Sequence, residues 1–118
     1  MYIILADDHY DVRQAFECLL CDEPDLHLAG EATNTTELLA QLSSACPDVV
    51  LLDWELPGRT ADILIRIREV CPDARVVAAS VHPEACEEAR QVGIHEFISK
   101  GDPPEIVMAT VRGARSRA

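Results

Sequence analysis

The chain has 118 residues, 48% of them hydrophobic and 26% charged, a composition typical of one folded domain. Its 21 acidic and 10 basic residues give a net charge of −11, which argues against direct binding to DNA, RNA or an anionic membrane surface. No apolar run approaches the roughly 20 residues that span a bilayer, and the N-terminus lacks the basic start of a secretory signal, so we expect a cytoplasmic domain over residues 1–118.

Two hydrophobic patterns alternate along the chain. Short apolar runs predict strands at residues 2–6, 26–30, 49–52, 76–79 and 96–98. Apolar residues at helical spacing predict helices at residues 9–22, 34–45, 61–71, 82–92 and 102–114. Strict alternation of five strands and five helices is typical of an α/β fold. We therefore predict a doubly wound, five-stranded parallel sheet with helices on both faces.

Two of the helix starts carry capping signals. Asn34 with Glu37 three residues later is a capping-box sequence. Asp102 followed by Pro103 is typical of a capping residue and a first helical position.

The five cysteines follow no regular pattern. Their number is odd, their spacing is irregular and no export signal precedes them, so a disulfide framework is not expected. Cys18 and Cys21 form a C-x-x-C pair near the end of a predicted helix, with no partner pair elsewhere. We expect both to be small buried or half-buried residues rather than a metal or redox site.

Polar residues that could perform chemistry follow four of the predicted strands. Open parallel sheets bind ligands outside the carboxyl ends of their strands. The residues at these ends are Asp7, Asp8, Asp53, Ser80, Ser99 and Lys100. Taken alone, an aspartate there could cap the next helix and a serine could belong to a turn. Lys100, however, is the only lysine of the chain, and it would face three carboxylates.

Carboxylates brought together need a counter-charge. Two of them about 4 Å apart repel by roughly 4 kcal/mol at an effective dielectric near 20, so such a cluster is protonated or binds a cation. Hard oxygen ligands with open positions suit Mg²⁺, which binds one or two carboxylates together with a phosphate. The strand ends therefore predict phosphoryl transfer, in which a carboxylate attacks phosphorus while Mg²⁺ and Lys100 neutralise the charge.

Four stretches at these strand ends resemble the receiver domain of two-component response regulators, which implies a CheY-like, flavodoxin-like fold. They are ILADDH at residues 4–9, VVLLDWELPG at 49–58, AS at 79–80 and FISK at 97–100. The resemblance covers essentially the whole chain, and the four stretches together are specific where each alone is weak. The ADDH run, with Arg13 and residues 30–32, is most similar to the NarL/LuxR-type subclass, which is joined to a helix-turn-helix DNA-binding domain.

The resemblance implies a role for each site residue. Asp53 matches the phosphoacceptor, which also binds the metal, and Lys100 matches the lysine that pairs with the phosphate. Asp8 matches a direct Mg²⁺ ligand, and Asp7 the acid that holds a metal-bound water. The metal-binding backbone carbonyl, the hydroxyl that moves toward the phosphoryl group and the aromatic switch residue are matched by Glu55, Ser80 and Phe97.

The resemblance also implies a mechanism and partners. A sensor histidine kinase presents a phosphohistidine, Asp53 accepts the phosphoryl group, Ser80 and Lys100 move inward and Phe97 turns in, as a shift between two populations. The surface from residue 86 to about 101 changes shape. Such receivers can pair as homodimers, turn over no substrate, and act on transcription through an output domain, here expected beyond residue 118 and expected to make the DNA contacts.

Departures from the family pattern keep a second function open. Val81 stands where alanine or glycine is usual and could narrow access to Asp53, and residues 59–62 lack a second glycine after Gly58. Both favour a receiver fold that acts through protein contacts with little phosphorylation. Gly101 replaces a cis-linked proline, as is common in the helix-turn-helix subclass.

A third alternative is an aspartate-nucleophile phosphatase on a related fold. That class needs a second acid two residues after the nucleophile, where Glu55 stands, but this chain has no room for a cap domain.

Overall fold

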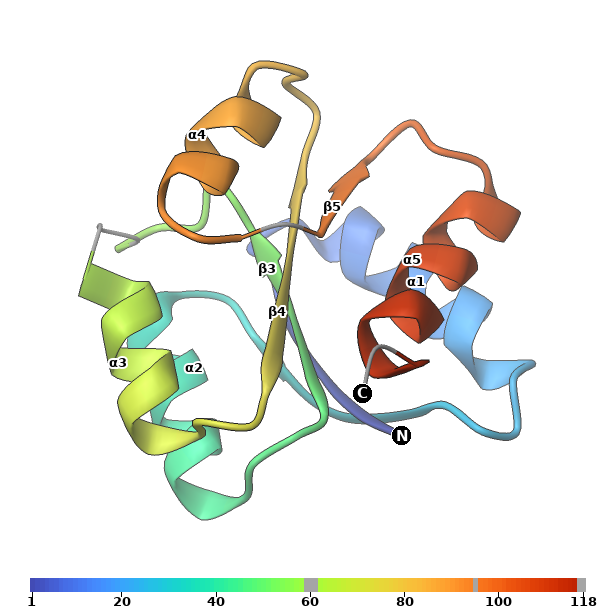
Figure 1. The fold of residues 1–118 in the computed structure, drawn as a ribbon. Coiled ribbons are helices and arrows are strands. Elements are labelled where there is room, and N and C mark those ends of the chain that lie inside the picture. Colours follow the sequence, from blue (N-terminus) through green and yellow to red (C-terminus); the bar gives the residue numbers. More distant parts are fainter. Residues whose placement is uncertain (59–61, 95, 117–118) are drawn as a thin grey trace.

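The computed structural model describes residues 1–58, 62–94 and 96–116, and their side chains as far as residue 113. It shows a parallel sheet between two layers of helices (Figure 1). The strands are β1 (Tyr2–Ala6), β2 (His27–Ala32), β3 (Val49–Asp53), β4 (Arg75–Ser80) and β5 (Phe97–Ser99). The helices are α1 (Tyr10–Cys21), α2 (Thr35–Ser44), α3 (Asp62–Val70), α4 (Ala85–Gln91) and α5 (Pro104–Ser116). The strand order is β2-β1-β3-β4-β5 with every pair parallel, so the predicted doubly wound sheet is confirmed.

The central strands are buried on both faces, which explains their continuous apolar runs. Successive side chains of a strand point to opposite faces of the sheet. Ile4, Val50 and Leu52 therefore pack in one core cluster with side chains of α2, α3 and α4. Ile3 and Leu51 pack in the other cluster with side chains of α1 and α5. Figure 1 shows the α1 and α5 layer on the opposite side of the sheet from α2 and α3.

Several element bounds differ from the sequence prediction, and backbone hydrogen bonds explain two of the differences. The second strand extends to Ala32, whose carbonyl accepts the N–H of Asp7 at 2.9 Å. The fourth helix begins only at Ala85, because residues 82–85 form a turn in which the Ala85 N–H donates to the His82 carbonyl at 3.1 Å. Residue 61, predicted to start the third helix, lies outside the described residues. None of the described helices is both long and apolar enough to cross a bilayer.

One of the two capping predictions is confirmed. Asn34 Oδ1 accepts the N–H of Glu37 at 2.9 Å, and the Glu37 carboxylate accepts the N–H of Thr33 at 2.7 Å, so the start of α2 is satisfied from both sides. The cap predicted at Asp102 is wrong by one residue, since α5 begins at Pro104. The Asp102 carboxylate instead accepts the N–H of Ser99 at 3.0 Å, at the end of β5.

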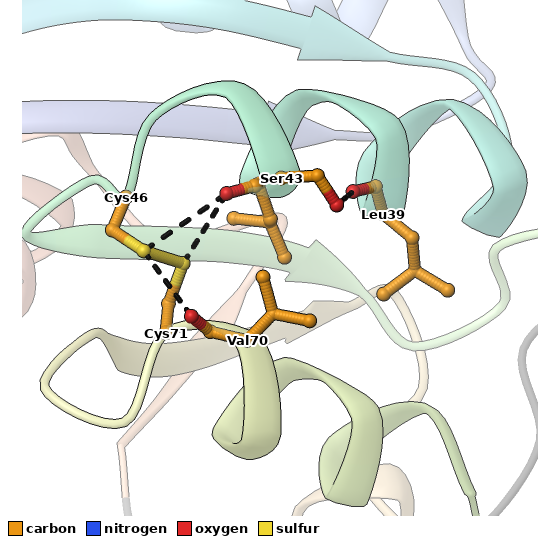
Figure 2. Close-up of a disulfide and its surroundings, with 6 residues drawn as sticks. Leu39, Ser43, Cys46, Val70 and Cys71 are labelled. Atoms are coloured by element: carbon orange, nitrogen blue, oxygen red, sulfur yellow. Dashed lines mark hydrogen bonds between the residues drawn. A yellow bond between two sulfur atoms is a disulfide. The ribbon is translucent and has the colours of Figure 1, made fainter.

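Cys46 and Cys71 form a disulfide, so the expectation of no disulfide is wrong. Cys46 lies in the loop before β3 and Cys71 directly follows α3, ahead of β4. Because β3 and β4 are adjacent parallel strands, their starting ends bring the two Cα atoms within 5.5 Å. Figure 2 shows the sulfur atoms near the ends of two helices, and they lie 3.5 to 3.9 Å from the carbonyl oxygens of Leu42 and Val70.

The burial expected for Cys18 and Cys21 is also wrong, because both are exposed. They lie in the second half of α1, whose buried residues are Phe16 and Leu20. Small apolar side chains at these spacings therefore lie outside the core-facing stripe of the helix.

Reduction of the disulfide is expected to lower the free energy of unfolding by about 3 kcal/mol, because the bridge joins residues 25 apart and restricts the unfolded chain. After reduction, the thiols of the folded protein carry hydrogens and can donate to the Leu42 and Val70 carbonyls. Urea unfolding with and without dithiothreitol measures the difference. Cys46→Ser should unfold like the reduced protein under both conditions, and Cys86→Ser should keep the full effect of the reductant. A reductant effect of equal size in Cys46→Ser would contradict the prediction.

Candidate functional site

The buried polar residues of the described structure gather at one edge of the sheet. Asp7, Asp53 and Ser80 are 1%, 1% and 0% exposed, whereas the other buried side chains are apolar. Asp7 follows β1, and the other two end β3 and β4, which are neighbours of one another. Burying a carboxylate is costly unless it is paired or hydrogen-bonded. This edge therefore requires cationic or hydrogen-bonding partners.

Lys100 supplies one of these partners. Its Nζ lies 2.8 Å from Oδ2 of Asp7 and 3.2 Å from Oδ1 of Asp53, and its side chain is only 9% exposed. Its main-chain N–H donates to the carbonyl of Ser80 at 2.9 Å, which continues the pairing of β5 with β4. The short last strand thus places the only lysine of the chain beside two buried carboxylates, Asp7 and Asp53, of the three predicted to surround it.

The pKa values of Asp53 and Lys100 are shifted by burial and by nearby charges. Burial raises the pKa of Asp53 above its ordinary value, and the charge of Asp7 adds to this. The N–H of Glu55, 3.1 Å from Asp53 Oδ1, and the ammonium group of Lys100 act in the opposite direction. Burial opposes the charge of Lys100, but its hydrogen bond to Asp7 and the charges of both aspartates raise its pKa.

His9 also belongs to the site, although sequence reasoning gave it no role. Its Nδ1 lies 3.0 Å from Oδ1 of Asp7, 3.1 Å from Oδ1 of Asp8 and 3.9 Å from Oδ2 of Asp53. The hydrogen bond with Asp7 and the charge of Asp8 raise the pKa of His9. Its place directly after two aspartates at a strand end was the signal that could have revealed it.

These residues form a candidate metal centre. One ligand atom from each of Asp7, Asp8, His9 and Asp53 lies within 4.8 Å of every other. Oδ2 of Asp53 is buried and has no hydrogen-bond partner. An unpartnered buried carboxylate oxygen beside other carboxylates fits a divalent cation, since hard oxygen donors are the ligands that Mg²⁺ prefers.

Ser80 and Glu55 lie together beside this cluster. The hydroxyl of Ser80 donates to both carboxylate oxygens of Glu55 at 2.9 Å, and its oxygen accepts the N–H of His82 at 2.9 Å. In this structure the predicted mobile hydroxyl is therefore held by Glu55. The sequence singled out Glu55 for its backbone carbonyl, so the contact made by its side chain was missed.

The remaining predicted residues lie near the same edge. Phe97 is half-buried and packs against the core cluster on the α2, α3 and α4 side of the sheet. Val81, expected to narrow access to Asp53, has a side chain that is largely exposed. The roles of both residues stay predictions.

Arg13 stabilises the turn that carries Asp7. Its guanidinium donates to the main-chain carbonyl of Asp7 at 2.9 Å and pairs with the Glu31 carboxylate at 3.2 Å. In the sequence, Arg13 and Glu31 indicated only a similarity to the NarL/LuxR-type subclass. A contact between α1 and β2 has no signature in local periodicity, so this positioning role was not predicted.

The family of the chain is established by comparison with known proteins. The profile of the response regulator receiver domain matches residues 3–112, so the chain belongs to this family. The signal receiver domain of a NarL response regulator from Mycobacterium tuberculosis is 30% identical, with a TM-score of 0.82 over 98% of this chain and 97% of that one.

Curated relatives specify the family further. The nitrate/nitrite response regulator NarL of Escherichia coli K12 is 31% identical over 115 residues, which are 95% of this chain and 53% of that protein. These similarities support a receiver of the NarL/LuxR-type subclass. A protein-glutamate methylesterase/protein-glutamine glutaminase of Pseudomonas savastanoi is 33% identical over 102 residues, which are 83% of this chain and 28% of that protein. The chain thus spans about half or less of these two relatives.

Removing the ammonium group of Lys100, which lies between Asp7 and Asp53, should destabilise the fold. Lys100→Gln leaves two buried carboxylates facing each other, and we expect a loss of about 3 kcal/mol at neutral pH. The loss should shrink as pH falls. Burial already raises the pKa of Asp53, and loss of the ammonium group removes a charge that lowers it, so the penalty exists only where this carboxylate is ionised.

Urea unfolding at about pH 7 and about pH 5 measures this dependence. Arg66→Gln, at an exposed position of α3, is the matched control and should change stability little at either pH. An equal loss at both pH values would contradict the electrostatic explanation.

Proposed function

We propose that this receiver accepts a phosphoryl group on Asp53 from the phosphohistidine of a sensor histidine kinase. The observation behind this proposal is the surroundings of the buried Asp53 carboxylate, with Lys100 at one oxygen and an unpartnered second oxygen beside Asp8 and His9. Asp53 Oδ1 attacks phosphorus and the phosphorus–nitrogen bond breaks. The histidine nitrogen leaves with the electron pair and takes a proton from solvent. The product is an acyl phosphate.

The side chains around Asp53 have distinct tasks in this reaction. Lys100 Nζ lies beside Oδ1, so it can pair with a phosphoryl oxygen attached there. In this proposal Asp7, Asp8, Asp53 and the backbone carbonyl of Glu55 hold Mg²⁺. When bound, Mg²⁺ neutralises the charge that develops on the transferred group.

The switch in this proposal is the exchange of one hydrogen bond for another. Ser80 must release the Glu55 carboxylate before its hydroxyl can donate to a phosphoryl oxygen. Phe97 then turns inward from its half-buried position, and the surface from residue 86 to about 101 changes shape. Phosphate shifts the population toward this state by as much as it binds that state better.

The rest of the proposal concerns the whole protein. Residues 1–118 form the phosphoacceptor domain, and any output domain lies beyond them. The similarity to NarL supports transcription control through a DNA-binding output domain, with a receiver homodimer as a further expected contact. Its place of action is proposed to be cytoplasmic, and its receiver turns over no substrate. The phosphatase alternative finds little support, because the Glu55 carboxylate that would act as the second acid accepts the Ser80 hydroxyl.

Phosphorylation of Asp53 is the decisive test. Incubation with acetyl phosphate and Mg²⁺ should add one phosphoryl group, seen by intact mass spectrometry and removed by hydroxylamine as expected for an acyl phosphate. Asp53→Asn should abolish the addition, whereas Asp73→Asn, at an exposed aspartate after α3, should leave it unchanged.

The same experiment separates the alternatives. If the folded protein gains no phosphoryl group in the presence of Mg²⁺, the result favours a protein-interaction module over a phosphoacceptor. Steady turnover of a phosphomonoester would favour the phosphatase.

Loss of the Glu55 carboxylate should ease the switch. In Glu55→Ala the Ser80 hydroxyl has no acid to release, and one such hydrogen bond is worth about 1 kcal/mol, so the rate of labelling should rise about fivefold. Glu84→Ala removes another exposed acid near His82 without touching Ser80 and serves as the matched control for charge. Equal acceleration in both variants would assign the effect to charge alone.

A further inference from the structure

The carboxylate oxygens of the site divide into two sets with different partners. Lys100 faces Oδ2 of Asp7 and Oδ1 of Asp53 at 2.8 and 3.2 Å. The imidazole Nδ1 of His9 faces the other set: Oδ1 of Asp7, Oδ1 of Asp8 and Oδ2 of Asp53, at 3.0, 3.1 and 3.9 Å. The lysine therefore neutralises one side of the cluster, while a ring nitrogen lies at the other.

The set of carboxylate oxygens that His9 faces includes one without a hydrogen-bond partner. Asp53 is 1% exposed, and its Oδ2, which belongs to this side, has no hydrogen-bond partner. A buried carboxylate oxygen without a partner is costly, so it points to a cation that this side of the cluster is built to hold.

Local backbone structure keeps the ring of His9 over this side. His9 is the N-cap residue of α1 with extended dihedral angles, and its side chain does not cap the helix. Its main-chain N–H donates to Oδ1 of Asp7 at 2.8 Å, which ties the residue to the cluster. The start of α1 thus fixes the position of the imidazole, but the imidazole does not cap the helix.

The separations suit neighbouring ligands of one ion. For metal–ligand bonds of about 2.1 Å, adjacent ligands of an octahedral ion lie about 3.0 Å apart and opposite ligands about 4.2 Å apart. The distances of 3.0 and 3.1 Å from Nδ1 to Asp7 and Asp8 match adjacent positions. The 3.9 Å to Asp53 matches neither value, so binding of one ion by all three residues requires a small movement of the His9 ring or of Asp53.

We propose that His9 is an additional ligand in this metal site, and that its nitrogen makes the site prefer a first-row transition ion such as Mn²⁺ over Mg²⁺. An imidazole nitrogen suits these ions, whereas Mg²⁺ favours oxygen ligands and retained waters. On binding, Nδ1 gives its proton to solvent and the ring keeps the proton on Nε2. The inference rests on the proposed phosphoacceptor site and adds the identity of its metal.

The test compares the affinities of two metals in three proteins. Mn²⁺ and Mg²⁺ are titrated separately into the wild-type protein, His9→Asn and His82→Asn. The titrations are run at about pH 8, above the ordinary imidazole pKa, because the hydrogen bond with Asp7 and the charge of Asp8 raise the pKa of His9. Calorimetry gives the dissociation constants. The asparagine keeps a hydrogen-bond donor beside Asp7 but supplies an oxygen ligand, and His82 is a comparably exposed histidine outside the cluster.

We expect His9→Asn to weaken Mn²⁺ binding about tenfold and to change Mg²⁺ binding less than about threefold. His82→Asn should bind both metals as the wild type does. A Mn²⁺ preference of equal size in the wild type and His9→Asn would overturn the proposal. So would tighter binding of both metals to His9→Asn, because His9 would then be an internal counter-ion in place of a metal.

A spectroscopic measurement on the wild-type protein does not depend on the folding of any variant. Electron spin echo modulation of bound Mn²⁺ should show coupling to an imidazole nitrogen, and its absence would overturn the proposal. Labelling of Asp53 with acetyl phosphate in the presence of Mg²⁺ separates the two ideas. If labelling succeeds while the nitrogen signal is missing, only the role of His9 fails. If labelling fails both with Mg²⁺ and with Mn²⁺ while the nitrogen signal is present, the phosphoacceptor proposal fails.

Discussion

The structure depends on one ammonium group that holds two buried carboxylates together. Asp7 and Asp53 are almost completely buried at the ends of adjacent strands, and Lys100 reaches both within 3.2 Å. Two such carboxylates without a cation would repel each other and lose their hydration. The short strand β5 positions this cation, because its pairing with β4 continues into the main-chain bond from Lys100 to Ser80. The same strand pairing that completes the sheet therefore also places the cation of the site.

The site is asymmetric around this pair. On one side Lys100 neutralises the aspartates, and on the other Asp8 and His9 face an oxygen of Asp53 that has no hydrogen-bond partner. The Ser80 hydroxyl donates to the Glu55 carboxylate rather than to any of these aspartates. A buried nucleophile with one satisfied and one unsatisfied oxygen is suited to bind a cation and then a phosphoryl group. The bond between Ser80 and Glu55 defines the state from which a switch would start.

The opposite ends of the same strands carry the covalent link. Cys46 and Cys71 precede β3 and β4, and these strands end at Asp53 and Ser80. The disulfide therefore lies at the end of these two strands opposite to Asp53 and Ser80. Reducing compartments keep most thiols reduced, so the oxidation state of this bridge in the proposed cytoplasmic setting depends on its stability against cellular reductants.

The sequence by itself determined the order of elements, the parallel sheet and the strand-end residues Asp7, Asp53, Ser80 and Lys100, because periodicity and position along each strand are local properties. Tertiary structure alone decided which side chains meet across elements. The disulfide and the hydrogen bond from Ser80 to Glu55 join residues that lie far apart in the sequence. The position of the His9 ring depends on its side-chain rotamer. Hydrophobic periodicity predicts neither kind of contact. Exposure of Cys18 and Cys21 was decided in the same way, because a helix buries only the stripe that its neighbours cover.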